Sequence, residues 1–282
     1  MDTSEEIRQF LSSRRARLTP ARSGLPTYGR QRRVPGLRRE EVALLAGISI
    51  DYYTRLERGN GRGVSDEVLG AIARALQFST DERTHLENLV RAANAEPAAV
   101  PTAVPHDQVR PGIRRIIDCM TLIPALVRNR RLDVLYANSL GRALYVEAFE
   151  DRHHAPSPLR YAFLDPRSRQ FWVDWDAAAD EMVGLLRAEA GRKPQDAAVA
   201  SLVDELSRRS EAFAARWAQH DVRLHRKGVA RLRHPQVGPM TLAYEDLDLP
   251  TEPEQTILVF TAESGSASEE ALRALSKVGP DA

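Results

Sequence analysis

The segment from residue 37 to residue 59, LRREEVALLAGISIDYYTRLERG, limits the possible folds more than any other part of the chain. Small and apolar residues follow a helical spacing over Val42–Ala46, and Gly47 ends that helix because glycine readily adopts the left-handed conformation of a sharp turn. Ser49 is a suitable N-cap for a second helix, which turns Tyr53 inward. Two short helices joined in this way predict a helix-turn-helix, whose second helix enters the major groove of DNA.

An ordinary hairpin of two helices also favours a glycine turn and is the alternative interpretation. We favour the helix-turn-helix because five positions at its spacing carry the small, turn and core residues that the motif needs. These residues are Ala43, Gly47, Ile48, Tyr53 and Leu56. A second group should face outward from the second helix and meet DNA, and it consists of Ile50, Asp51, Thr54, Arg55 and Arg58.

Three of these outward residues have a second interpretation. Ile50 would then lie at the rim of the interface, and Asp51 would only complement the positive end of the helix dipole. Arg55 would contact a phosphate without reading the base sequence. The sequence leaves these alternatives open.

Nine arginines and no acidic residue occur from Arg14 to Arg39. So dense a run is typical of a surface that binds phosphate, although a solvated loop is the alternative. Because the run leads directly into the helix-turn-helix, we expect it to face DNA. The expected phosphate contacts are Arg32, Arg33, Arg38 and Arg39.

Three further helices should complete the first domain: one that begins near Thr3 and carries apolar residues as far as Leu18, one after Ser65 with an apolar face from Val68 to Leu76, and one capped by Ser79 with an apolar face from Leu86 to Val90. Arg14 lies on the apolar stripe of the first of them, seven residues after Ile7. A covered charge needs a partner, and we expect Glu57 to provide it.

The five-helix order resembles the Cro/repressor-type DNA-binding domain, known as the XRE family, through the spacing of Ala43, Gly47 and Leu56 and the ending Leu56–Gly59. The long arginine-rich connection before the motif, RLTPARSGLPTYGRQRRVPGLRREEVA, is similar to that of the MmyB-like regulators, a bacterial subgroup of this family. The resemblance implies a sequence-specific transcription regulator that binds double-stranded DNA, and we expect a homodimer.

The length of 282 residues exceeds one typical domain. We expect a DNA-binding domain over residues 1–95, a proline- and alanine-rich linker over 96–108, a second domain over 109–264 and a tail over 265–282. Residues 1–95 carry 16 basic and 12 acidic side chains, so the positive charge gathers in the first domain. A single cysteine, Cys119, fits a reducing cytoplasm, and no stretch is apolar enough to predict a membrane span or a signal peptide.

The second domain should have an α+β fold, because strand patterns at both of its ends enclose helical ones. Residues 126–136 read as a hairpin around Asn129-Arg130, and the strands at the other end cover 222–224, 229–232, 240–247 and 256–261. Turns are expected at Gly228 and at 235–238. Between the strands, one apolar stripe runs from Val199 to Trp217 and predicts a single long helix.

This half of the chain also resembles the MmyB-like family, whose second domain is a PAS-like ligand-binding domain. The similar segments are Leu164–Pro166, Asp174-Trp175, Leu186-Arg187, Trp217–Val222, His234-Pro235 and Gly238. The resemblance implies a small, lipid-like ligand such as a fatty acid.

Large aromatic residues gather in the middle of the chain, and some of them should line a ligand pocket. The expected ligand-binding residues are Tyr161, Phe163, Trp172, Trp175, Phe213, Trp217 and His220. Each aromatic residue could equally fill a core. We find no metal-ligand spacing and no pairing of nucleophile and base, so we expect neither a metal site nor an enzyme. Two rival functions for the second domain stay open: a dimerisation or docking module without a ligand, and an enzyme that the first domain places on DNA.

Overall fold

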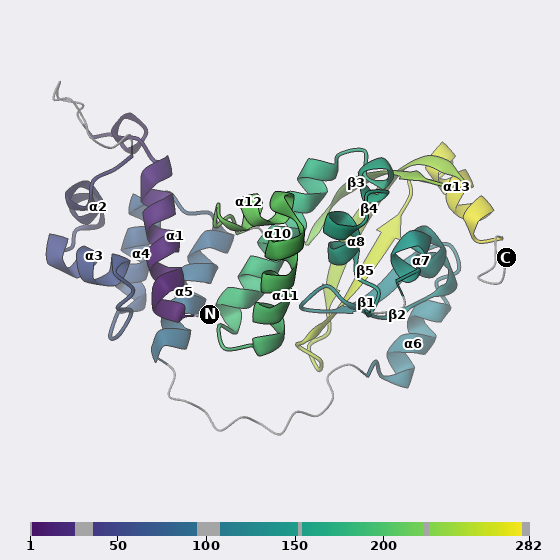
Figure 1. The fold of residues 1–282 in the computed structure, drawn as a ribbon, viewed down its shortest axis with the longest axis horizontal. Helices are drawn as coiled ribbons and strands as arrows, with labels where there is room; N and C mark the ends of the chain where they lie inside the picture. The colour runs from purple at the N-terminus through teal and green to yellow at the C-terminus, as the bar shows by residue number, and fades with distance from the viewer. Residues whose placement is uncertain (1, 26–35, 95–107, 152–153, 223–225, 278–282) are drawn as a thin grey trace. The chain divides into compact units, whose positions relative to one another are not determined.

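The computed structural model describes residues 2–25, 36–94, 108–151, 154–222 and 226–277. The chain forms two compact units. Unit 1 consists of residues 1–99, 187–203 and 215–224, and unit 2 of residues 100–186, 204–214 and 225–282. The described part of unit 1 is helical, whereas unit 2 contains a β-sheet (Figure 1).

Unit 1 begins with the five helices that the sequence predicts. Their bounds are α1 Thr3–Arg17, α2 Arg39–Ala46, α3 Ile50–Glu57, α4 Asp66–Ala75 and α5 Thr80–Asn94, with a short 3-10 helix η1 at Pro20–Ser23. Polar side chains cap several of them, because the first backbone N–H groups of a helix have no partner within it. The Asp2 carboxylate accepts a hydrogen bond from the Ser4 N–H at 3.0 Å, and the Ser49 hydroxyl accepts one from the Tyr52 N–H at 3.1 Å.

Gly47 makes the turn between α2 and α3, as predicted. Its φ of 67° lies in the left-handed region, and the Ile48 N–H donates back to the Ala43 carbonyl at 3.0 Å. Gly59 allows a close approach of two backbones. Its φ is 95°, and a Cβ there would lie 2.3 Å from the Ser4 carbonyl oxygen. Only glycine therefore lets the chain leave α3 this close to α1.

The core of unit 1 joins residues that lie far apart in the sequence. Ile7 and Phe10 of α1, Tyr53 and Leu56 of α3 and residues of α4 and α5 are buried in one apolar cluster. Val222 belongs to the same cluster, and Ala188 packs against it. Unit 1 thus includes segments of the chain more than 90 residues beyond its last predicted helix.

Glu57 is buried at the end of α3, but its partner is not the one that we predicted. The carboxylate pairs with Arg15 at 2.8 Å and with Arg39 at 3.3 Å. Arg14 lies one residue earlier on α1, is also buried and pairs with Glu82 and Asp221, each at 3.1 Å. One residue corresponds to about 100° of rotation around a helix, so α1 presents its two arginines to different neighbours.

Unit 2 is built on a five-stranded antiparallel sheet with the order β2-β1-β5-β4-β3. The strands are β1 Ala125–Asn129, β2 Val134–Ala137, β3 Lys227–His234, β4 Gly238–Asp248 and β5 Gln255–Thr261. The helices are α6 Pro111–Asp118, α7 Ser139–Leu144, α8 Pro158–Leu164, α9 Ser168–Phe171 and α13 Ala267–Leu275, with the 3-10 helix η2 at Val146–Phe149. The predicted hairpin of β1 and β2, the strands β3, β4 and β5 and the α+β class are confirmed.

The two faces of the sheet have different tasks. Val127 and Ile257 are opposite one another on β1 and β5 and pack with Ile117 of α6 on one face. Because side chains alternate along a strand, Arg128 and Leu258 point to the other face. That second face carries the cavity described below.

Three further helices precede β3 in the sequence: α10 Trp175–Arg192, α11 Ala197–Arg209 and α12 Glu211–Trp217. The single helix predicted over Val199–Trp217 was wrong. Ser210 separates α11 from α12 and its hydroxyl accepts a hydrogen bond from the Phe213 N–H at 3.3 Å, so it caps the second helix.

Two further expectations differ from the structure. Gly228 lies inside β3, opposite Tyr244, rather than in a turn. Residues 265–282, expected as a tail, include α13, whose Leu272 and Leu275 are buried and which packs against β4 and α7. The expected strand over 222–224 falls largely outside the described residues.

The position of Glu57 leads to a first prediction. Glu57→Ala should lower the free energy of unfolding by about 3–5 kcal/mol, because it leaves Arg15 partly buried without its partner. A double-mutant cycle by urea denaturation should give a coupling energy above about 1 kcal/mol for Arg15 with Glu57. The same cycle with Arg14 in place of Arg15 is the control and should give less than about 0.5 kcal/mol. Equal coupling energies in the two cycles would contradict the pairing.

Candidate DNA interface and ligand cavity

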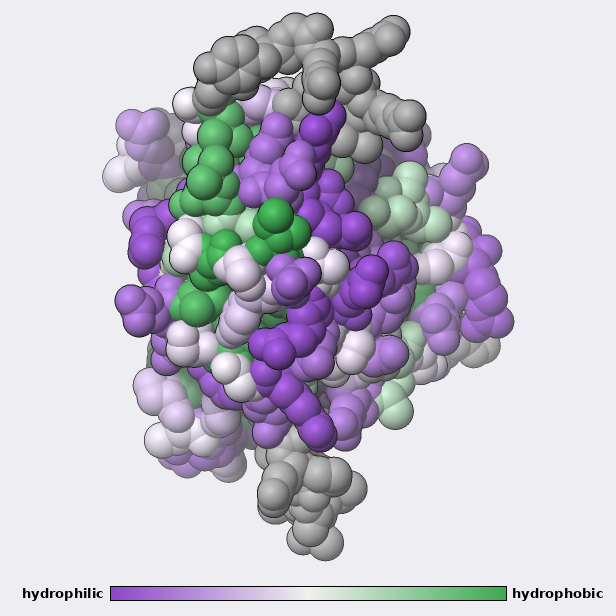
Figure 2. Space-filling view, turned by 90° about the vertical axis from the view of Figure 1, so that its left-hand side faces the viewer, coloured by the Kyte–Doolittle hydropathy of each residue, from purple (hydrophilic) through white to green (hydrophobic). Residues whose placement is uncertain are grey.

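The outer face of α3 is exposed in the way that DNA reading requires. Ile50 is 52% exposed, and the side chains of Asp51, Arg55 and Arg58 are also exposed, while Thr54 is half-buried. Tyr53 and Leu56 turn inward and anchor the helix in the core. Figure 2 looks onto the side of the molecule where α2 and α3 lie and shows hydrophobic residues bordered by strongly hydrophilic ones. Leu44 of α2, which is 72% exposed, adds to this apolar surface.

The arginines around this face differ in how firmly they are held. The Arg55 guanidinium lies 4.9 Å from the centre of the Tyr52 ring, which orients it without occupying its hydrogen-bond donors. Arg38 and Arg39 are exposed at the start of α2 and pair with Glu40 at 3.2 Å and with Glu57 at 3.3 Å. Arg32 and Arg33 lie outside the described residues.

Unit 2 contains a cavity of about 140 Å³ between α10 and the sheet. Helix α10 contributes five lining residues, which are Ala177, Ala178, Glu181, Met182 and Leu185. The sheet contributes Leu258 and Phe260 of β5, and Tyr145 and Trp172 close it from the segments between. Most of this lining is apolar, which is typical of a small-molecule site.

A few polar groups converge on the apolar lining. Tyr145 is buried, which raises the pKa of its phenol, and its hydroxyl has no hydrogen-bond partner within the described residues. Arg128 forms a buried ion pair with Asp246, whose second oxygen also lacks a partner in the described part of the chain. The Tyr244 hydroxyl donates to the Glu181 carboxylate at 2.7 Å. Tyr145 is therefore the group best placed to bond a polar atom of a ligand.

One rim of the cavity is formed by the chain before α10 and by β3. The Arg231 guanidinium donates two hydrogen bonds of 2.6 Å to the Asp174 carboxylate, and both side chains are exposed. Val173 and Val229 beside them are 50% and 64% exposed. Apolar surface thus continues out of the cavity at this rim.

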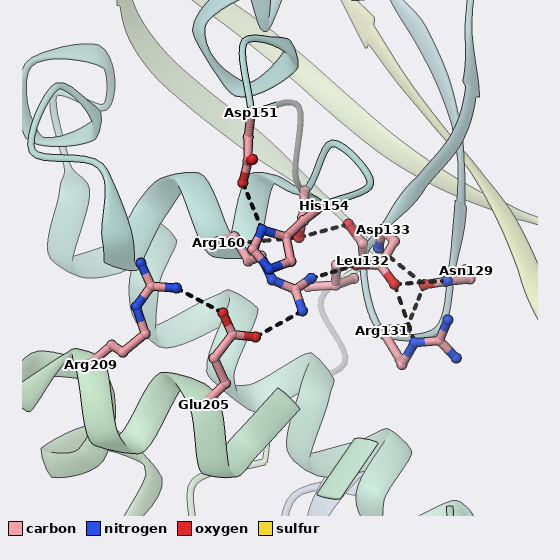
Figure 3. Close-up of polar contacts among 10 residues, drawn as sticks. Asn129, Arg131, Leu132, Asp133, Asp151, His154, Arg160, Glu205 and Arg209 are labelled. Atoms are coloured by element: carbon pink, nitrogen blue, oxygen red, sulfur yellow. Dashed lines mark hydrogen bonds and ion pairs between the residues drawn. The ribbon is translucent and has the colours of Figure 1, made fainter. Parts of the chain in front are cut away.

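A second hollow of about 440 Å³ lies elsewhere in unit 2 and is lined mainly by charged residues. Its cations are already paired, as Figure 3 shows: Arg160 bonds Asp133 at 3.1 Å and Glu205 at 3.0 Å, and Arg209 bonds the same glutamate at 3.0 Å. His154 contacts Asp151 at 3.0 Å. A hollow lined mainly by paired charges is a poor match for an apolar ligand. We therefore favour the cavity under α10 as the ligand site.

The predicted ligand-binding residues divide among four places. Trp172 lines the cavity under α10, whereas Tyr161 lines the charged hollow. The Phe163 ring stands edge-on to Trp175 at 5.7 Å and to Phe213 at 5.2 Å, which forms an aromatic cluster of its own. The last two, Trp217 and His220, lie in unit 1.

Trp217 and His220 surround Arg187, the most deeply buried charge in the described chain. Arg187 is on α10, and its side chain is only 1% exposed. The guanidinium stacks 3.7 Å from the centre of the Trp217 ring, donates to the Trp217 carbonyl and pairs with the Glu6 carboxylate at 3.0 Å. The same nitrogen that meets Glu6 lies 3.0 Å from His220 Nδ1. Because arginine can only donate, this imidazole nitrogen must accept.

Two histidines of unit 1 are held neutral by this surrounding. Burial lowers the pKa of His85 on α5 to about 3, and neither of its ring nitrogens has a hydrogen-bond partner within the described residues. Burial, together with the Arg187 charge, lowers the pKa of His220 to about 4. Arg14 donates to the His220 carbonyl at 2.6 Å and so closes the network against α1.

Sequence reasoning gave no role to Arg187, Tyr145 or Arg128. For Arg187 a signal was present, because a single arginine follows the apolar residues Val183, Leu185 and Leu186 at helical spacing. The cavity residues of β1 and β5 come from strands that are distant in sequence, and no local pattern brings them together. In the described residues no three His, Cys, Asp or Glu side chains group as metal ligands.

The geometry defines a protein that combines a helix-turn-helix with a cavity-bearing α+β domain, the organisation of a ligand-responsive transcription regulator. Residues 7–86 match a helix-turn-helix domain, and residues 109–275 match the MmyB-like transcription regulator ligand binding domain. The chain therefore belongs to the family of MmyB-like transcription regulators. It is a DNA-binding regulator with a ligand-binding domain and not an enzyme. No curated protein matches the chain, and none of the helices in its described parts has the length and apolar character to cross a membrane.

The buried histidines predict that acid destabilises unit 1. The native imidazoles stay neutral down to pH 4 or below, whereas those of the unfolded chain take up protons near pH 6.5. Stability is therefore lost as the pH falls through about 6.5, by up to about 2 kcal/mol per histidine between pH 7 and pH 5.

His85→Leu should remove the contribution of one histidine. Urea denaturation followed by circular dichroism should show that this variant loses about 2 kcal/mol less than the parent between the two pH values. Burial raises the pKa of Glu6, which acts in the opposite direction but equally in both proteins. The same loss in parent and variant would show that His85 protonates in the native state.

Proposed function

We propose that the protein binds specific DNA sequences through the outer face of α3 and responds to a small, lipid-like molecule in the cavity under α10. The observation that supports the first part best is the exposure of Ile50, Asp51 and Arg55 on a helix whose opposite side is anchored in the core. The second part is supported by an apolar cavity with one unpartnered hydroxyl, that of Tyr145. Both parts go beyond what the family assignment alone states.

In this proposal, the residues at the DNA interface have two different tasks. Arg55 grips a guanine through its O6 and N7 atoms, while Ile50, Asp51 and Thr54 contact neighbouring base edges. The arginines of α2 and of the preceding segment hold phosphates, together with Arg58, and fix the register. We further propose that the protein acts in the cytoplasm as a homodimer, because helix-turn-helix proteins commonly pair two half-sites.

The size of the cavity restricts the ligand. A volume of about 140 Å³ is below the roughly 300–1,000 Å³ of typical ligand pockets. An apolar cavity of about 150 Å³ in another protein binds benzene. The cavity therefore suits a short chain or the end of a longer one. The exposed Val229, which lines the cavity, would contact the part of a long chain that extends out of it.

The Arg55 proposal makes a prediction about sequence selectivity. Arg55→Ala should lose affinity for the preferred duplex by about 1–3 kcal/mol more than for random DNA, because a bidentate contact to guanine discriminates by that amount. Selection from randomised DNA with parent and variant at equal salt measures this. The preference should relax at one base pair per half-site.

Arg91→Ala is the control, since Arg91 is an exposed arginine on α5. It should return the motif of the parent unchanged. If Arg55→Ala also returned that motif with the same information at every position, Arg55 would contact only phosphate.

The cavity proposal is tested with straight-chain fatty acids of increasing length and with phenol. A compound that enters the cavity should raise the melting temperature, because it binds only the folded state, and should change the fluorescence of Trp172 at the cavity wall. Ala178→Phe should abolish both effects by filling the space. Ala155→Phe places the same side chain at the charged hollow and should leave both effects intact. No response to any of these compounds would favour a docking module without a ligand.

A further inference from the structure

Helix α10 is a single element that belongs to both units. Its residues 175–186 are counted in unit 2, and residues 187–192 in unit 1. The cavity of unit 2 takes five of its lining residues from the first part. Arg187 follows Leu185, the last of them, after only two positions.

The last part of α10 is held within unit 1 by an ion pair, by apolar packing and by a close approach to α5. Arg187 makes the buried ion pair with Glu6 of α1, and Ala188 packs against the apolar core that α1 shares with α3. Gly191 lies so near α5 that a Cβ there would approach His85 Cε1 to 2.3 Å. A shift of this helix end would therefore disturb α1 and α5 directly.

The distance along the helix is short. Arg187 follows Ala178 by nine positions on α10, which at 1.5 Å per residue corresponds to about 13.5 Å along the helix axis. Because each backbone N–H bonds a carbonyl four residues earlier, a displacement of one turn is passed on to the next. The cavity-lining residues and the ion-pair residue are thus parts of one continuous hydrogen-bonded rod.

We propose that α10 couples the cavity to the DNA-binding unit, with the Arg187–Glu6 ion pair as the contact that passes a displacement of α10 to α1. An occupant of the cavity displaces the residues that α10 presents there, and Arg187 moves with them. Glu6 follows because a guanidinium that loses its partner while buried is strongly destabilised. α1 also carries Arg15, which pairs with Glu57 of α3, so a displacement of α1 would also affect α3.

The proposal rests on the cavity as the ligand site, but its test needs no ligand. Ala178→Phe serves as a permanent occupant, because the added ring enters the space that a ligand would take. Affinity is measured for the duplex that the full-length parent selects from randomised DNA. We expect Ala178→Phe to change this affinity about fivefold or more, the lower range of allosteric couplings.

The change should depend on the ion pair. In a Glu6→Gln background, which keeps an acceptor for Arg187 but removes the charge, the effect of Ala178→Phe should fall to less than twofold. Glu87→Gln is the matched control, since it removes a carboxylate from the exposed pair with Arg83 on α5. In that background the full effect should remain. Equal effects in all three backgrounds, or no effect in the parent, would overturn the proposal.

Hydrogen exchange gives a second measurement if Glu6→Gln fails to fold. Ala178→Phe in the otherwise unchanged chain should alter the protection of α1 more than that of α4, and unchanged protection of α1 would overturn the proposal. The ligand screen and this test fail independently. A fatty acid that binds while Ala178→Phe leaves DNA affinity unchanged would support the ligand site and exclude the coupling.

Discussion

A fully buried guanidinium is the constraint on which much of unit 1 depends. Arg187 has five N–H donors, and in the described structure they meet the Glu6 carboxylate, His220 Nδ1 and the Trp217 carbonyl, while Nε has no partner. A charge removed from water is tolerated only where such acceptors surround it. The three acceptors come from α1 and from residues 217–220, so these segments must assemble around the end of α10.

A buried ion pair such as Arg187–Glu6 does more to specify how the helices pack than to raise the free energy of unfolding. The desolvation of both ions offsets most of their attraction, whereas the loss of one partner leaves an unpaired buried charge. Burial accordingly lowers the pKa of Arg187 to about 10 and raises that of Glu6. Alternative packings of α10 that leave Arg187 without Glu6 are therefore disfavoured, although an apolar pair of the same shape would provide as much stability. Within unit 1, charge therefore helps to specify how α1 packs against residues 187–203 and 215–222.

The sequence predicted well what local patterns determine. The α2–α3 turn needs one left-handed residue at Gly47 and one cap at Ser49, and both are visible in a stretch of a few residues. The hairpin of β1 and β2 and the α+β class likewise follow from alternation and turn signals. The pairing of Glu57 was missed because Arg14 and Arg15 are adjacent, and a stripe of apolar residues does not tell which of two neighbours points to a given helix.

The sites in unit 2 could not be predicted from the sequence, because their residues come from segments that lie far apart in the chain. Large aromatic residues such as Phe163 and Trp217 are equally suited to a core and to a pocket. Which of the two roles each one takes depends on the tertiary structure, in particular on which residues α10 packs against. Trp172 lines the cavity, whereas Trp217 covers Arg187 in unit 1. The sequence also did not show that residues 187–203 and 215–224 belong to the compact unit that contains α1–α5.

Because α10 belongs to both units, its position bears on how such a regulator could respond to a ligand. A flexible linker alone would let each unit keep its own equilibrium, since a ligand shifts only states that differ in their contacts with it. In the proposed coupling, α10 removes this independence, because a change in the contacts of its first part would alter the packing of its last part. A ligand in the proposed site would contact α10, because this helix supplies five of the lining residues of the small cavity. The proposal therefore needs both features: a small cavity that leaves a ligand little room beside the first part of α10, and a desolvated ion pair that holds the last part of this helix to α1.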